Sequence, residues 1–370
     1  MTSRLFSVTF FIFLTITFLS CSQQSAENQQ GDFENLPVAD IQLISEFDQS
    51  GDYSFQHLNY STETLANGDV LLNDREGAYI IQVTPQGELV RLVAGKGNGP
   101  GEVQDPQSMD MLGESTLLIV DQRRLRIIKK SLDSSDIEEF ELPQGDASRV
   151  NEAHKTTQPG VVSVHWFDFS IFKNSEARPK TRVSSYNYQS EEFISDIRYP
   201  GRTNALLRID GGDPVGSTKI PFTPELLYDY SADNSELYAF WPENSTIAVL
   251  DPVKLDTVRA IAVELPSESL TSAERDTLES DYQAEFWPSV EQLLPEQKVP
   301  ADKMIIGPQN RIWLKLTLQS DQQEWMVLDK SGSPQFRVQF PKEGIVTHIS
   351  DHHIGFRADD HVFALYNLIE

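Results

Sequence analysis

Beyond residue 38, apolar and polar residues alternate over short stretches separated by turn-forming residues, which predicts β-strands joined by hairpins. Four stretches repeat the same order of turn, strand, polar loop, strand, turn and strand, and they begin at Ala66, Leu112, Asp233 and Pro308. One further extended segment precedes each stretch: HLNYSTETL, PQSMDML, PELLYDY and ADKMIIG in chain order. The repeating unit therefore has four strands.

The turns that open these stretches contain residues that readily adopt the positive φ of tight hairpins. They are Asn67-Gly68, Gly113-Glu114, Asn234-Ser235 and Gln309-Asn310. The recurrence of this turn chemistry supports a true structural repeat.

Two less regular units complete the pattern. Three strands are expected between Val161 and Pro200, and three more between Gly344 and the end of the chain. The last unit lacks a fourth strand, which Ala39–Phe47 could supply by pairing with Val362–Leu368. Four-stranded units spaced by roughly 40–50 residues are typical of a β-propeller. We predict an all-β fold, a single six-bladed β-propeller over residues 39–370, although five or seven blades would also fit the irregular third unit.

A helical insertion interrupts the strands at about 268–295. Thr271 and Glu274 have the spacing of a capping box at a helix start. Apolar residues then recur with helical spacing, at Leu278, Tyr282 and Phe286. We expect Pro288 to end this helix, a second short helix to follow, and the apolar face to pack on the ring rather than on a partner.

The first twenty residues have the layout of an export signal: a positive start, then an apolar stretch too short to span a bilayer. They end in FLSC, which resembles the lipobox of bacterial lipoproteins. We therefore expect a lipoprotein signal peptide at 1–20 and lipid attachment at Cys21, the only cysteine. A plain secretory signal with an incidental cysteine is the alternative. Residues 21–38 are polar and predict a flexible tether that buries nothing.

The segment GKGNGPGEVQDP, Gly95–Pro106, concentrates glycine between two expected units. A phosphate-binding loop would need Lys and then Ser or Thr after its last glycine, but Glu102 stands there. The glycines also alternate, and no helical pattern follows them, which excludes the dinucleotide-binding fingerprint. We interpret the segment as a crossover between blades in which glycine allows a sharp turn.

This crossover resembles the inter-blade motif G-x-G-x-G-P-G-E of a family of six-bladed β-propeller lipoproteins from Gram-negative bacteria, related to NHL-repeat proteins. The matching residues are Gly95, Gly97, Gly99, Pro100, Gly101, Glu102 and Pro106. Val103 departs from the aromatic residue often found in the family. The resemblance, with NRIWLKLTL around Trp313, covers nearly the whole chain. It implies a propeller at the cell envelope and leaves the ligand open.

Local motifs for chemistry are absent from the sequence. The seven histidines include no HExxH pair, and we expect His352 and His353 to point to opposite faces of a strand. The DGGD segment, Asp210–Asp213, lacks the ligand series of an EF-hand and is interpreted as a solvated turn. No G-x-S-x-G nucleophile elbow and no sialidase-type Asp box is present. We therefore assign no catalytic, cofactor-binding or metal-binding residue and no cofactor.

The tryptophans are spread over the units, and we expect them mainly to fill gaps between blades rather than to form binding platforms. They are Trp166, Trp241, Trp287, Trp313 and Trp325.

The formal net charge is −26, which makes nucleic acid an unsuitable partner. Together these features predict a monomeric, membrane-anchored envelope lipoprotein whose propeller is a non-enzymatic scaffold for a protein or glycan ligand. Ser22 is compatible with sorting to the outer membrane, on its periplasmic or its surface face. The alternative is a metal-dependent lactonase or lyase whose ligands come singly from different blades and meet at the central channel.

Overall fold

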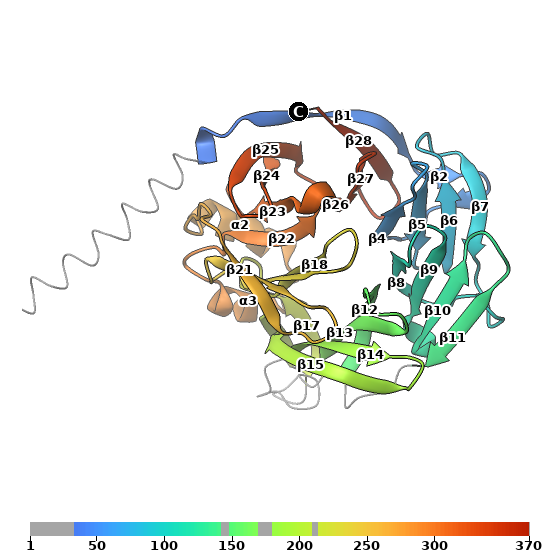
Figure 1. Cartoon of the computed structure of the whole chain (residues 1–370). Helices are drawn as coiled ribbons and strands as arrows, with labels where there is room; N and C mark the ends of the chain where they lie inside the picture. The colour runs from blue at the N-terminus through green and yellow to red at the C-terminus, as the bar shows by residue number, and fades with distance from the viewer. Residues whose placement is uncertain (1–32, 142–147, 169–179, 209–213, 370) are drawn as a thin grey trace, which may run out of the picture.

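The computed structural model describes residues 33–141, 148–168, 180–208 and 214–369. Small antiparallel sheets are arranged radially around a central axis (Figure 1), which is the architecture of a β-propeller. The predicted all-β propeller is confirmed. No helix in these ranges is long and apolar enough to cross a bilayer.

Within each four-stranded sheet the first strand lies nearest the axis and the last lies outermost (Figure 1). These sheets are β4–β7 (Leu58–Thr64, Val70–Asp74, Tyr79–Val83, Leu89–Ala94), β8–β11 (Pro106–Met111, Thr116–Asp121, Arg126–Ser131, Ile137–Glu141), β12–β15 (Ser148–Lys155, Val161–Asp168, Lys180–Asn187, Glu192–Pro200) and β18–β21 (Leu227–Tyr230, Leu237–Phe240, Thr246–Leu250, Thr257–Ala262). An eight-stranded sheet contains β22–β25 (Ala301–Ile306, Ile312–Leu316, Gln322–Leu328, Pro334–Pro341), followed by β1 (Val38–Phe47), β28 (Phe363–Ile369), β27 (Ile354–Arg357) and β26 (Ile345–Ile349). Two small hairpins are β2–β3 (Gln49–Ser50, Tyr53–Ser54) and β16–β17 (Asn204–Arg208, Pro214–Lys219).

The apolar core lies between neighbouring sheets. The middle strands β5 and β6 are buried along their whole length, whereas the outer strand β7 is largely exposed. Leu71 and Ile80 of these middle strands pack against Leu117 and Ile119 of the next sheet. Each sheet therefore covers one face of its neighbour, as stacked repeats require.

The two ends of the chain meet in one sheet. β1 pairs antiparallel with β28 from Asp40 opposite Ile369 to Phe47 opposite Phe363, which confirms the predicted ring closure. β1 also pairs briefly in parallel with β25, where Val38 lies opposite Arg337. This short contact joins two groups of four strands into the eight-stranded sheet.

The buried part of the described chain begins before residue 39. Phe33 is 4% exposed and packs in a core cluster with Leu227 and Phe240, and Leu36 contacts the same cluster. The expectation that residues 21–38 bury nothing is therefore wrong for Phe33. Residues 1–32, with Cys21, lie outside the described residues.

The helical insertion contains α2 (Ser272–Asp281) and α3 (Trp287–Leu293). The predicted capping box is present, because the Thr271 hydroxyl accepts from the Glu274 N–H and the Glu274 carboxylate accepts from the Thr271 N–H. The expectation that Pro288 ends the first helix is wrong. α2 ends at Asp281, and Pro288 stands in the first turn of α3, where the missing N–H costs nothing.

The insertion packs on the ring, as predicted. Val290 and Leu294 form a buried cluster with Ala205 and Ile220, and the cluster is completed by the predicted apolar face Leu278, Tyr282 and Phe286. Between the third and fourth units, β16 and β17 form a hairpin that packs against α3. Asp210–Asp213, interpreted above as a solvated turn, lies outside the described residues.

The glycine-rich segment crosses from β7 to β8, as predicted. Its Glu102 carboxylate folds back and accepts a hydrogen bond from the Gly99 N–H at 2.6 Å. A Cβ at Gly97 would overlap this carboxylate, and Gly101 has a φ of +71°. The glycines are needed for both the turn and the close approach of Glu102.

Candidate functional site

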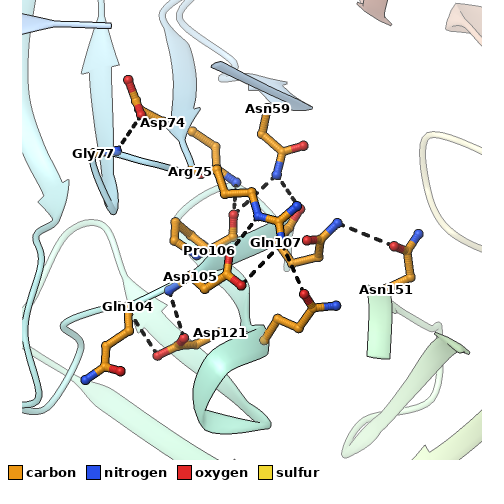
Figure 2. Close-up of polar contacts among 12 residues, drawn as sticks. Asn59, Asp74, Arg75, Gly77, Gln104, Asp105, Pro106, Gln107, Asp121 and Asn151 are labelled. Atoms are coloured by element: carbon orange, nitrogen blue, oxygen red, sulfur yellow. Dashed lines mark hydrogen bonds and ion pairs between the residues drawn. The ribbon is translucent and has the colours of Figure 1, made fainter. Parts of the chain in front are cut away.

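Amide side chains near the start of successive inner strands are joined by hydrogen bonds, and we call this group the amide layer. Asn59 of β4 donates to the carbonyls of Pro106 and Gln107, at 3.3 and 2.6 Å. Gln107 of β8 donates in turn to Asn151 of β12 at 3.4 Å, so the layer steps from blade to blade (Figure 2). Arg75 supports it from the β5–β6 turn through an ion pair with Asp105, 2.6 Å from Nε to Oδ1.

Further along the same strands, titratable side chains from successive blades converge in what we call the axial cluster. It contains Glu63 (β4), Asp110 (β8), Glu152 and His154 (β12), Asp229 (β18) and Lys303 (β22), which influence one another electrostatically.

Three members of the axial cluster also tie one blade to the next. Asp110 accepts from the backbone N–H of Lys155 at 2.8 Å, and Asp229 accepts from that of Ile306 at 2.6 Å. Lys303 donates to the carbonyl of Val346. These three side chains therefore help to hold neighbouring blades together.

Between β12 and β18, histidine rings of one blade stack on tyrosine rings of the next, and we call this group the His–Tyr stack. Tyr230 stacks on His154 with 4.3 Å between centroids, and Tyr228 stacks on His165 at 3.8 Å. The Tyr230 hydroxyl donates to Ser163 at 2.6 Å and lies 2.7 Å from His165 Nε2. His165 is 1% exposed, and burial lowers the pKa of its imidazole to about 3, so the ring is neutral at neutral pH.

Glu63 differs from the other axial carboxyl groups. Among the described residues it has no hydrogen bond or ion pair, whereas Asp110 and Asp229 hold backbone N–H groups and Glu152 lies 3.3 Å from His154. Burial, followed by the charges of Asp110 and Asp229, holds the pKa of Glu63 well above its usual range. Burial and the nearby acids thus favour the neutral form of the Glu63 carboxyl group, and its oxygens are uncommitted among the described residues.

Other axial groups have pKa values displaced towards neutrality. Burial raises the pKa of Asp229 to about 6 and lowers that of Lys303 to about 8. The pKa of His154 is raised, because Glu152, Asp110 and Asp229 together outweigh its burial. Groups of this kind can exchange protons near pH 7 and can bind ligands whose charge they match.

No three His, Cys, Asp or Glu side chains in the described ranges are placed to hold a metal ion. His348 contacts Thr62 and Thr64 at the β26–β4 contact, and His154 and His165 belong to the His–Tyr stack. The histidines expected on a strand lie in the β26–β27 turn instead, where His353 is buried and His352 is exposed.

The tryptophans mainly fill the core, as expected. Trp166, Trp313 and Trp325 are at most 3% exposed, and Trp287, in α3 of the insertion, packs against the buried cluster between the insertion and the ring. Trp241 is only partly buried and donates to Glu243 at 3.0 Å.

None of the axial residues was assigned from the sequence, and β12 was missed altogether. A usable signal is present: the first strand of successive units carries an acid, as in NYSTET, SMDM, VNEAHK and LYDY. These acids stand on the strands that lie nearest the axis of the ring (Figure 1).

Known proteins share this fold at low sequence identity. No protein-family profile matches the chain, and no curated protein does. A structure from Bacteroides fragilis, described as an exported protein, is 10% identical, covers 90% of this chain and 96% of that chain, and has a TM-score of 0.52. A member of the DUF4221 family from Bacteroides vulgatus is 11% identical, with coverages of 90% and 99% and a TM-score of 0.51. The WD40 repeats of RRP9 are 8% identical, with coverages of 90% and 99% and a TM-score of 0.50. This chain is similar to all three as a propeller.

Proposed function

We propose that this protein is an exported lipoprotein whose propeller binds a small ligand carrying a basic group, an amine or a guanidinium, at the axial cluster. The observation that carries the proposal is the convergence of acids from separate inner strands around Glu63. If the axial acids served only to hold the blades together, each of them should have a hydrogen-bond or ion-pair partner within the protein.

The charges around Glu63 favour a cationic ligand, because the effects of Asp110 and Asp229 on this carboxyl group precede the opposing effect of Lys155 in size. The carboxyl groups of Glu63, Asp110, Glu152 and Asp229 oppose the cations Lys155, Lys303 and His154, and the mutual repulsion of the acids contributes to the raised pKa of Glu63. A ligand cation beside Glu63 would favour the ionised carboxylate and replace its missing partner.

Calorimetric titration with agmatine and spermidine tests this function. We expect saturable binding with proton release that depends on the buffer, because Glu63 ionises as the cation arrives. Glu63→Gln should weaken binding at least tenfold, whereas Glu114→Gln, at an exposed turn, should leave it unchanged. Absence of binding by wild type, or equal binding by Glu63→Gln, would contradict the proposal.

A second candidate is an enzyme of the lyase or lactonase type at the same cluster. The Glu63–Asp110 pair favours it, because neighbouring carboxyl groups with raised pKa values suit general acid catalysis near neutral pH. Turnover of a lactone panel that is lost in Glu63→Gln would support the enzyme; binding without turnover would support the scaffold.

We further propose anchoring through a lipid on Cys21 in the outer membrane and a ring of six blades, obtained by counting the eight-stranded sheet as two. Incorporation of labelled palmitate should be lost in Cys21→Ala, and the variant should leave the outer-membrane fraction. A wild-type protein that takes up no label would overturn the anchor. An experimental density map would decide the blade number.

A further inference from the structure

A cavity lies apart from the axial cluster, and we call it the seam pocket. It measures about 460 Å³ and lies between the β22–β23 turn, the β26–β27 turn and the end of β28. This volume is within the range of small-molecule sites. Its walls include the Trp313 ring and the apolar side chains of Ile349, Ile354 and Leu368.

The indole of Trp313 carries an unused donor at this pocket. The residue is 1% exposed, yet its Nε1–H has no hydrogen-bond partner. Buried donors are usually satisfied, because leaving one unpaired destabilises the fold. Gly307 maintains the space beside the nitrogen, because a Cβ there would lie 2.8 Å from Nε1.

Three polar side chains around the pocket are also uncommitted among the described residues. Gln309, Asp351 and Asn367 come from three separate elements, and each lines the cavity without a side-chain partner. Gln309 is held there with a φ of +60°, an unusual conformation for a residue with a side chain. The set offers an indole donor, a carboxylate acceptor and two amides that both donate and accept.

We propose that the seam pocket binds a neutral saccharide. Hydroxyl groups both donate and accept, so they match amides and a carboxylate together, and one sugar oxygen can accept the indole N–H. The apolar walls suit the C–H surface of a sugar ring. The lining carries one guanidinium, Arg311, and one carboxylate, Asp351, so their charges offset each other and do not select a charged ligand. The lining contains no member of the axial cluster, so the site is separate from the amine site.

The Trp313 indole reports occupancy directly. The full chain, labelled with ¹⁵N, is titrated with glucose, N-acetylglucosamine and their β-1,4-linked disaccharides, and the Trp313 signal is identified with Trp313→Phe. At least one sugar should shift this signal saturably. Asp351→Ala and Asn367→Ala should each weaken that sugar at least fivefold, whereas Glu63→Gln should bind it like the wild type.

The proposal is overturned if no sugar shifts the indole signal. It is overturned equally if acetate or benzoate shifts the signal and the sugars do not, or if Asp351→Ala and Asn367→Ala both bind as wild type does. Far-UV circular dichroism of these variants verifies that each keeps the fold. Failure of amine binding at the axis would leave these results unaffected.

Discussion

The propeller is held together in different ways at its closing sheet and at the step from β12 to β18. At the closing sheet, consecutive backbone pairs join β1 to β28. From β12 to β18, the His–Tyr stack makes the connection through side chains. Backbone pairs carry no titratable group, whereas the stack contains two imidazoles. The first junction should therefore depend on apolar burial, and the second on protonation and on single hydroxyl groups.

The largest effect is expected at the closing sheet. Phe363 is 0% exposed and lies 6.0 Å from the ring of Phe47 across the pairing of first and last strands. Phe363→Ala should lower the free energy of unfolding by about 3–5 kcal/mol, as large core truncations do. Urea unfolding measures this, and Ile369→Ala, at a half-exposed position of the same strand, serves as the control with a change within about 0.5 kcal/mol.

A single hydroxyl should matter more in the His–Tyr stack than in the closing sheet. Tyr230→Phe leaves the buried Ser163 and His165 without their partner, and each unsatisfied group costs about 1–3 kcal/mol. We expect a loss of at least about 2 kcal/mol. Tyr366→Phe on β28 should change the unfolding free energy by less than about 0.5 kcal/mol. Equal losses in the two variants would remove the contrast between the junctions.

The two junctions should also differ in their response to acid. The folded pKa of His165, about 3, lies below its unfolded value, so only the unfolded chain takes up this proton as pH falls below about 6.5. Stability is thus lost between about pH 6.5 and 3. From pH 7 to 5, wild type should lose about 2 kcal/mol more than His165→Gln, measured by urea unfolding at each pH. Parallel pH profiles would contradict the assignment.

The smallest effect is expected where one side chain joins two inner strands. The Ser61 hydroxyl of β4 donates to the Met109 carbonyl at 3.0 Å and accepts from its N–H at 2.8 Å. Ser61→Ala should cost about 1 kcal/mol, because channel water can replace part of this bonding. A thermal shift as large as that of Tyr230→Phe would contradict the expectation that a hydroxyl group matters more in the His–Tyr stack than between β4 and β8.

Sequence patterns revealed those parts of the fold that depend on local chemistry. The Thr271–Glu274 cap acts over one helical turn, and Gly68 and Gly113 have the positive φ that their turns require. Ring closure was also predictable, because the last unit lacked a strand. β12 was missed because its sequence, SRVNEAHK, is mostly polar and lacks the alternation of apolar and polar residues that marks a half-buried strand.

The candidate site could not be predicted in the same way. Glu63, Asp110 and Asp229 stand singly on strands far apart in sequence, and only the radial arrangement brings them together. Their pKa values are raised by burial and, for Glu63 and Asp229, also by neighbouring carboxyl groups, and both causes depend on that arrangement. The unpaired indole N–H of Trp313 could not be predicted either, because it depends on how closely Gly307 packs against the ring.

The pairing of β1 with β28 also has a kinetic consequence. β1 and β28 are the first and last strands of the described residues, so their contact has a very large separation along the chain. Contacts of this kind form slowly, because a long loop must close before they give any stabilisation. Until then both strands expose unpaired backbone edges that could pair with other copies, so folding of this protein should be more vulnerable to aggregation before closure than after it.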